Sequence, residues 1–93
     1  MKKNTIVTFK NKKIKIPFDI LVDPKTAHEL ETIKNPFSKQ KAAIPKFAVA
    51  VYDVIKGAEV LYNQGALSNA ALMNKGRYWF QKYFIDAYGV LLD

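Results

Sequence analysis

The histidine at position 28 is the only histidine in the sequence, and its imidazole could hold a metal ion or move a proton. Glu31 follows at the i+3 position, which would place both groups on one side of a helix. A metal site needs further ligands, and the chain has no cysteine to supply them. One such pair is common by chance, so the sequence predicts an ordinary surface histidine.

The serines, glycines and carboxylates are placed no better for catalysis. Ser38 and Ser68 are the only serines, and neither lies in a nucleophile motif. The four glycines are isolated from one another, so no glycine-rich loop is available to hold a phosphate. Asp19 and Asp23 would lie roughly 13 Å apart on a strand, too far to share a proton. The sequence therefore predicts a protein that is not an enzyme and uses no cofactor.

Lysines in the first half of the chain account for the net charge of +7. Four of them surround an expected turn: Lys10, Lys12, Lys13 and Lys15. Such a cluster either keeps a hairpin tip soluble or binds an anionic partner. Apart from Arg77 every basic residue is a lysine, which contacts phosphate as a point charge, so any nucleic-acid binding is expected to be non-specific.

The start of the chain is basic but lacks the apolar run of a signal peptide. The longest uncharged run, residues 60–74, contains asparagine, glutamine, serine and glycine, which argues against a membrane span. The lack of cysteine fits an intracellular protein. We therefore expect an intracellular chain that is not secreted by a signal peptide and has no membrane partner.

Alternation of apolar and polar residues predicts an antiparallel β-hairpin over about residues 4–22. With Asn11 and Lys12 as its turn, Val7 would pair with Ile16, and the apolar side chains would share one face. Glycine is preferred to lysine at the second turn position, so a longer loop is the alternative. A hairpin alone is marginally stable, so it must pack on helices or pair with another chain.

Helix signals follow the hairpin. Asp23 and Pro24 form a cap pair that predicts a helix over about residues 24–34. Residues 35–45 are expected to be a surface connection that Phe37 anchors. Further helices are expected over about residues 45–63 and 68–86. The predicted fold is a small single α+β domain, residues 1–93, in which an N-terminal antiparallel β-hairpin packs on two to three α-helices.

The last predicted helix is apolar on two sides. One side is a core face around Phe80 and Phe84, and the opposite side has apolar residues at a spacing of seven, namely Ala71, Tyr78, Ile85 and Leu92. In one interpretation the helix ends near Ile85 and the remaining residues form a turn or short strand. In the other, the stripe binds another subunit, with Lys82 on its rim. The aromatic and basic residues at 77–83 could also stack single-stranded bases, although such clusters at helical spacing are more often core.

These observations predict a non-enzymatic structural or binding subunit of a larger protein assembly. The specific expectation is a virion component, an accessory protein that stabilises or decorates a bacteriophage capsid. Its partners would be larger protein subunits with an acidic surface, or second copies of the chain. The expected contacts are the stripe and its rim, Ala71, Tyr78, Lys82, Ile85 and Leu92, and for an anionic partner Lys10, Lys12, Lys13 and Lys15. The alternative is a small basic protein that contacts nucleic-acid phosphates non-specifically through the hairpin lysines.

Overall fold

The computed structural model describes residues 6–18, 23 and 25–92. In this part of the chain two antiparallel hairpins precede the helices: β1 (Ile6–Phe9) pairs with β2 (Lys12–Lys15), and β3 (Leu30–Lys34) pairs with β4 (Lys41–Pro45). Helices α1 (Lys46–Asn63) and α2 (Ala70–Tyr83) are joined through the short 3-10 helix η1 (Leu67–Asn69), and α3 (Ile85–Leu91) follows. This arrangement confirms the expected α+β class, with an N-terminal antiparallel hairpin beside helices.

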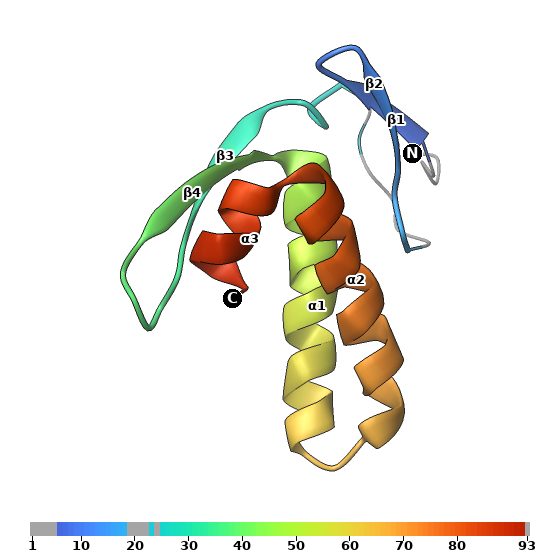
Figure 1. Ribbon diagram of the computed structural model, residues 1–93, viewed down its shortest axis with the longest axis vertical. Coiled ribbons are helices and arrows are strands. Elements are labelled where there is room, and N and C mark those ends of the chain that lie inside the picture. Colours follow the sequence, from blue (N-terminus) through green and yellow to red (C-terminus); the bar gives the residue numbers. More distant parts are fainter. Residues whose placement is uncertain (1–5, 19–22, 24, 93) are drawn as a thin grey trace.

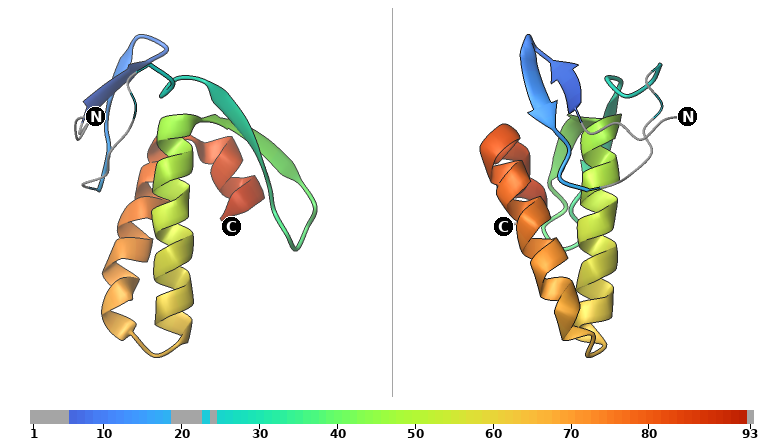
Figure 2. Two further views of the ribbon diagram at one scale, coloured as in Figure 1. Left: turned by 180° about the vertical axis from the view of Figure 1, so that it is seen from behind. Right: turned by 90° about the vertical axis from the view of Figure 1, so that its right-hand side faces the viewer.

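The helix pair formed by α1 and α2 is the long body of the molecule. Figure 1 shows α1 and α2 side by side, with their connection at one end and the two hairpins near the other. The views in Figure 2 agree on this placement. Helix α3 lies under the arch of β3 and β4 and contacts β4 (Figure 1).

The first hairpin forms with its turn one residue earlier than predicted. Lys10 and Asn11 have φ values of 51° and 65°, the backbone of a two-residue turn whose twist suits a hairpin. Val7 therefore pairs with Ile14 instead of Ile16. The register differs by two residues, so the apolar side chains keep the same face, and Val7 and Ile14 are both buried. Residues 19–22 of the predicted strand lie outside the described residues.

The predicted helix over residues 24–34 is wrong where the structure describes it. The Asp23 carboxylate accepts the backbone N–H of Lys25 at 2.9 Å, residues 25–28 form turns, and Leu30–Lys34 is strand β3. An aspartate can close a local turn without starting a helix. The β-branched residues Thr32 and Ile33 then favour pairing with β4. Pro24 lies outside the described residues.

The predicted helix over residues 45–63 is confirmed by α1. Pro45 occupies the N-cap position with φ −66° and ψ 154°, and Gly65 follows the helix with φ 102°. The N–H of Gly65 donates to the carbonyl of Tyr62, and the N–H of Ala66 donates to the carbonyl of Leu61, both at 3.0 Å. These bonds satisfy carbonyls at the helix end that have no partner within the helix.

The predicted helix over residues 68–86 is divided in two. Its backbone breaks at Phe84, which has φ −141° and ψ 58°, and continues as α3. The first interpretation of this segment was therefore close about the end of the helix, but wrong in expecting a turn or short strand afterwards. The Phe84 ring lies 5.9 Å from the Phe9 and Phe47 rings and 6.0 Å from the Phe80 ring, centroid to centroid. Packing among these rings favours the break over a straight helix.

Among the described residues, one hydrogen bond joins the first hairpin to the helices. The Nε1–H of buried Trp79 donates to the carbonyl of Lys15 at 2.7 Å, across 64 positions of sequence. Phe47 and Phe80 lie beside Trp79 and are fully buried. The hairpin is therefore held by both the aromatic core and a polar contact.

Trp79→Phe is expected to lower the free energy of unfolding by about 1–2 kcal/mol, because phenylalanine keeps a ring but fills less space and cannot donate to the Lys15 carbonyl. Urea unfolding followed by circular dichroism measures the change. Hydrogen exchange should show that the amides of β1 and β2 lose more protection than those of α1. Tyr78→Phe, which removes only an exposed hydroxyl, is the control. Equal protection of the hairpin in both variants would contradict the role assigned to the bond.

Candidate functional site

The apolar stripe predicted along the last helix is exposed only in part. Tyr78 is 70% exposed and Ile85 is 61% exposed, and Ala71 is also on the surface. Leu92 is only 9% exposed and belongs to the core. The break at Phe84 redirects the chain, so Leu92 does not extend the stripe. Partner binding by Ala71, Tyr78, Ile85 and their neighbour Lys82 stays a prediction.

The four lysines of the first hairpin are exposed but do not form one patch. Lys10 and Lys12 line a groove of about 650 Å³ between the two hairpins and the junction of α2 and α3. Lys15 lines a different groove, between β2 and α2. Side chains alternate along β2, which places Lys12 on one face and Lys13 and Lys15 on the other. Lys82 and Tyr83 line both grooves, so the end of α2 is where the two surfaces meet.

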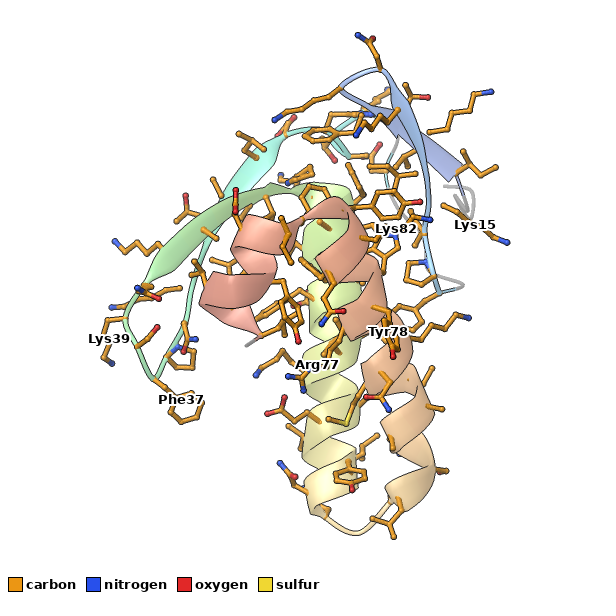
Figure 3. The ribbon with its side chains drawn as sticks, viewed as in Figure 1. Lys15, Phe37, Lys39, Arg77, Tyr78 and Lys82 are labelled. Carbon is orange, nitrogen blue, oxygen red and sulfur yellow. The ribbon has the colours of Figure 1, made fainter. Side chains whose placement is uncertain are left out.

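The groove between β2 and α2, which we call the tyrosine groove, has a volume of about 360 Å³. The strand side is Lys15, Ile16 and Pro17, and the helix side is Lys75, Tyr78, Trp79, Lys82 and Tyr83. Figure 3 shows Lys15, Tyr78 and Lys82 on this side of the molecule. This groove was not predicted, because its strand side and its helix side are far apart in the sequence. The mixture of aromatic and basic residues at 77–83 was a signal for the helix side alone.

The connection between β3 and β4, residues 35–40, exposes an aromatic side chain and is called the Asn35 loop. Phe37 is 88% exposed, so the expectation that it anchors this segment is wrong. Asn35 organises the loop: its Oδ1 accepts the N–H of Phe37 at 2.8 Å and of Ser38 at 3.3 Å, and its Nδ2–H donates to the carbonyl of Val90 at 2.8 Å. Figure 3 shows Phe37 and Lys39 at the end of the hairpin, and Phe37 lines one side of a groove whose other side includes Lys56 and Glu59 of α1.

The far end of the helix pair is apolar and carries no charge. Residues 60–74 contain no lysine, arginine, aspartate or glutamate. Large side chains are nevertheless exposed there: Val60, Leu61, Tyr62, Leu67 and Leu72. The uncharged run over residues 60–74 could have predicted this surface, but it was interpreted only as an argument against a membrane span. None of the helices in the described part of the chain is both long and apolar enough to cross a membrane.

Two titratable side chains, His28 and Asp53, have surroundings that bear on their chemistry. The Nε2–H of His28 donates to the carbonyl of Thr8, which ties the turn before β3 to β1. Burial raises the pKa of the Asp53 carboxyl, and the charge of nearby Glu31 raises it further. Within residues 6–18, 23 and 25–92, no three histidine, aspartate or glutamate side chains are grouped as metal ligands.

The described surface therefore offers three features suited to binding: an exposed aromatic on the Asn35 loop, a groove of tyrosines and lysines, and an uncharged apolar end. Exposed aromatic side chains, which all three features contain or adjoin, are enriched in protein interfaces. Comparisons with protein-family models, with curated proteins and with solved structures find no match to this chain. What the protein binds must be inferred from these surfaces.

Proposed function

We propose that the protein is a non-enzymatic binding subunit that attaches to a larger protein assembly through the Asn35 loop. The observation that carries the proposal is the 88% exposure of Phe37 on a loop held by its own hydrogen bonds. A large exposed aromatic contributes little to the stability of a monomer. In an interface the same side chain can fill a partner's pocket and supply much of the binding energy.

The hydrogen bonds of the Asn35 loop support this role because they order it before any partner arrives. The N–H of Asn35 donates to the carbonyl of Gln40 at 2.8 Å, and the N–H of Lys39 donates to the carbonyl of Asn35 at 2.9 Å. The bond from Asn35 to Val90 fixes the loop to α3. A loop that is already ordered loses less conformational freedom on binding, which favours affinity.

Lysines around Phe37 indicate the charge of the partner. Lys34 and Lys41 are directly opposite each other across β3 and β4, and Lys39 is exposed between them with φ 66°. Like charges in opposed positions destabilise a hairpin by roughly 0.2–1 kcal/mol. An acidic rim around the partner's pocket would remove this repulsion and would direct the approach of the loop. The partner is therefore proposed to have an apolar pocket with acidic residues at its edge.

The specific assembly that we propose is a bacteriophage particle, in which this chain would be an accessory protein that stabilises or decorates the capsid. Small size, the absence of cysteine and a net charge of +7 suit a protein that is added to larger shell subunits with an acidic surface. The exposed side chains Tyr78 and Ile85 would add area to the contact.

The test is sedimentation of the protein from the cells or particles that make it naturally. The wild type is expected in a stoichiometric complex, and Phe37→Ser should weaken that complex by about 30-fold or more, the effect of losing a hot-spot aromatic. Ile6→Ser is the matched control, because Ile6 is also exposed but lies on the first hairpin, outside the Asn35 loop. Wild-type protein that sediments only as a free 10.6 kDa chain would contradict the proposal.

A further inference from the structure

We propose that the tyrosine groove binds single-stranded nucleic acid, with a base stacked on Tyr78 and phosphates held by Lys15, Lys75 and Lys82. The inference does not depend on the Asn35 loop or on a protein assembly. It follows from three properties of the groove: the exposure of the aromatic ring, the rigidity of the wall beside it, and the sign of its charges.

Tyr78 supplies an accessible flat ring. It is 70% exposed, although most other aromatic side chains of α2 are packed inward. The side chains that line the groove from α2 occur at positions 75, 78, 79, 82 and 83, the spacing of a single helix face. Tyr78 therefore stands over the groove, with a lysine about one helical turn away on each side.

The wall next to Tyr78 is rigid. Trp79 is buried and its Nε1–H holds the Lys15 carbonyl, so the strand side of the groove is fixed to the helix side. The ring of Tyr83 lies 5.7 Å from the ring of Trp79, centroid to centroid. A groove with fixed walls can accept a planar group without first having to rearrange.

The charges that line the groove are all positive. Lys15, Lys75 and Lys82 are its ionic side chains, and no carboxylate is among the described residues that line it. The Nζ atom of Lys82 lies 5.2 Å from the centroid of the Tyr83 ring, so aromatic and cationic groups alternate along the groove. This is the combination that binds single strands: aromatic rings stack with bases of any sequence, and lysines contact the phosphates.

The dimensions suit a short single strand. Lys75 and Lys82 are seven residues apart on α2, about 10 Å along the helix axis. Stacked nucleotides advance by about 3.4 Å each, so this stretch of α2 would span about three nucleotides. A duplex fits less well, because its bases already stack on one another and leave none free for Tyr78. Without an arginine in the groove, we expect little preference among sequences.

Fluorescence anisotropy with a labelled oligothymidine of about 12 nucleotides tests the proposal, a length within the range that one small domain covers. A duplex of the same length and an acidic peptide of polyglutamate are the comparison probes. The oligothymidine should bind most tightly, and its affinity should fall steeply between roughly 50 and 200 mM salt. Trp79 is the only tryptophan and lines the groove, so its fluorescence should change when the oligothymidine binds.

Tyr78→Ala should weaken binding by about 5- to 100-fold, the effect of losing one stacked base, and Tyr78→Phe should bind like the wild type. Lys82→Gln should weaken binding and lower the salt slope by about one. Tyr62→Ala is the control, because Tyr62 is an exposed tyrosine near the far end of α1. Equal affinity of Tyr78→Ala and the wild type would overturn the proposal. So would tighter binding of the peptide, which would assign the groove to an acidic protein.

Discussion

Replacing Phe47 with alanine is expected to lower the free energy of unfolding by about 3–5 kcal/mol, a large share of the stability of a domain of this size. Phe47 is fully buried in the first turn of α1. Its ring lies 5.5 Å from Phe9 in the first hairpin, 6.2 Å from Trp79 in α2 and 5.9 Å from Phe84 at the helix break, centroid to centroid. The cavity would therefore open where the first hairpin and the helices meet.

The matched control for Phe47→Ala is Phe37→Ala. The chemical change is identical, but the Phe37 side chain lies in solvent, so its removal should alter the free energy of unfolding by less than about 0.5 kcal/mol. Urea unfolding of the two variants, followed by circular dichroism, gives the comparison directly. Similar losses at both positions would mean that Phe47 does not occupy the centre of the core or that Phe37 is not exposed.

Gly76→Val is expected to destabilise the protein by about 3 kcal/mol or more, because α1 and α2 approach closely at this glycine. A Cβ atom at position 76 would lie against Ile55, 2.7 Å from its Cδ1 atom, and 3.1 Å from Cζ of Phe18. Ile55 is itself buried, so it has little room to move. The added side chain would have to separate the two helices or displace Phe18.

Gly57→Val provides the control for Gly76→Val, since Gly57 is exposed within α1 and a Cβ atom there would meet no atom within 4 Å. Valine is a better helix former than glycine by only a few tenths of a kcal/mol, so the free energy of unfolding should change by less than about 0.5 kcal/mol. Thermal unfolding of both variants distinguishes them. A Gly76→Val variant as stable as the Gly57→Val variant would show that the helices do not meet at this position.

The parts of the fold that were predicted correctly depend on local signals. Helix α1 follows from its apolar face between Pro45 and Gly65, and the first hairpin follows from alternation. The predicted register of that hairpin, Val7 with Ile16, differs by two residues from the observed one, Val7 with Ile14. Both registers bury the same face, so the apolar pattern does not distinguish them and the position of the turn decides. Strand β3 was mistaken for a helix since its partner, residues 41–45, is a separate segment that no local pattern identifies.

The position of the break was predicted only approximately, because in the first interpretation the helix ended near Ile85. The break occurs at Phe84, where an aromatic ring joins a cluster from other elements, and no local pattern marks that residue. Because the chain changes direction at this break, Leu92 lies in the core and not on the predicted stripe. Tyr78 and Ile85 are exposed, so the binding of another subunit at these residues stays a prediction. Exposure of Phe37 could not be predicted, because the local sequence does not show whether an aromatic side chain in a loop packs inward or faces solvent.

The separation of charged and uncharged surfaces along the molecule has a consequence for the kinetics of association. Lysines occupy the two hairpins, and the opposite end of a body 38 Å long is free of charge. Such a distribution gives the protein an electric dipole moment along its long axis. In the field of an acidic surface the molecule would turn its hairpins forward before contact, so added salt would slow its association more than it would speed its dissociation.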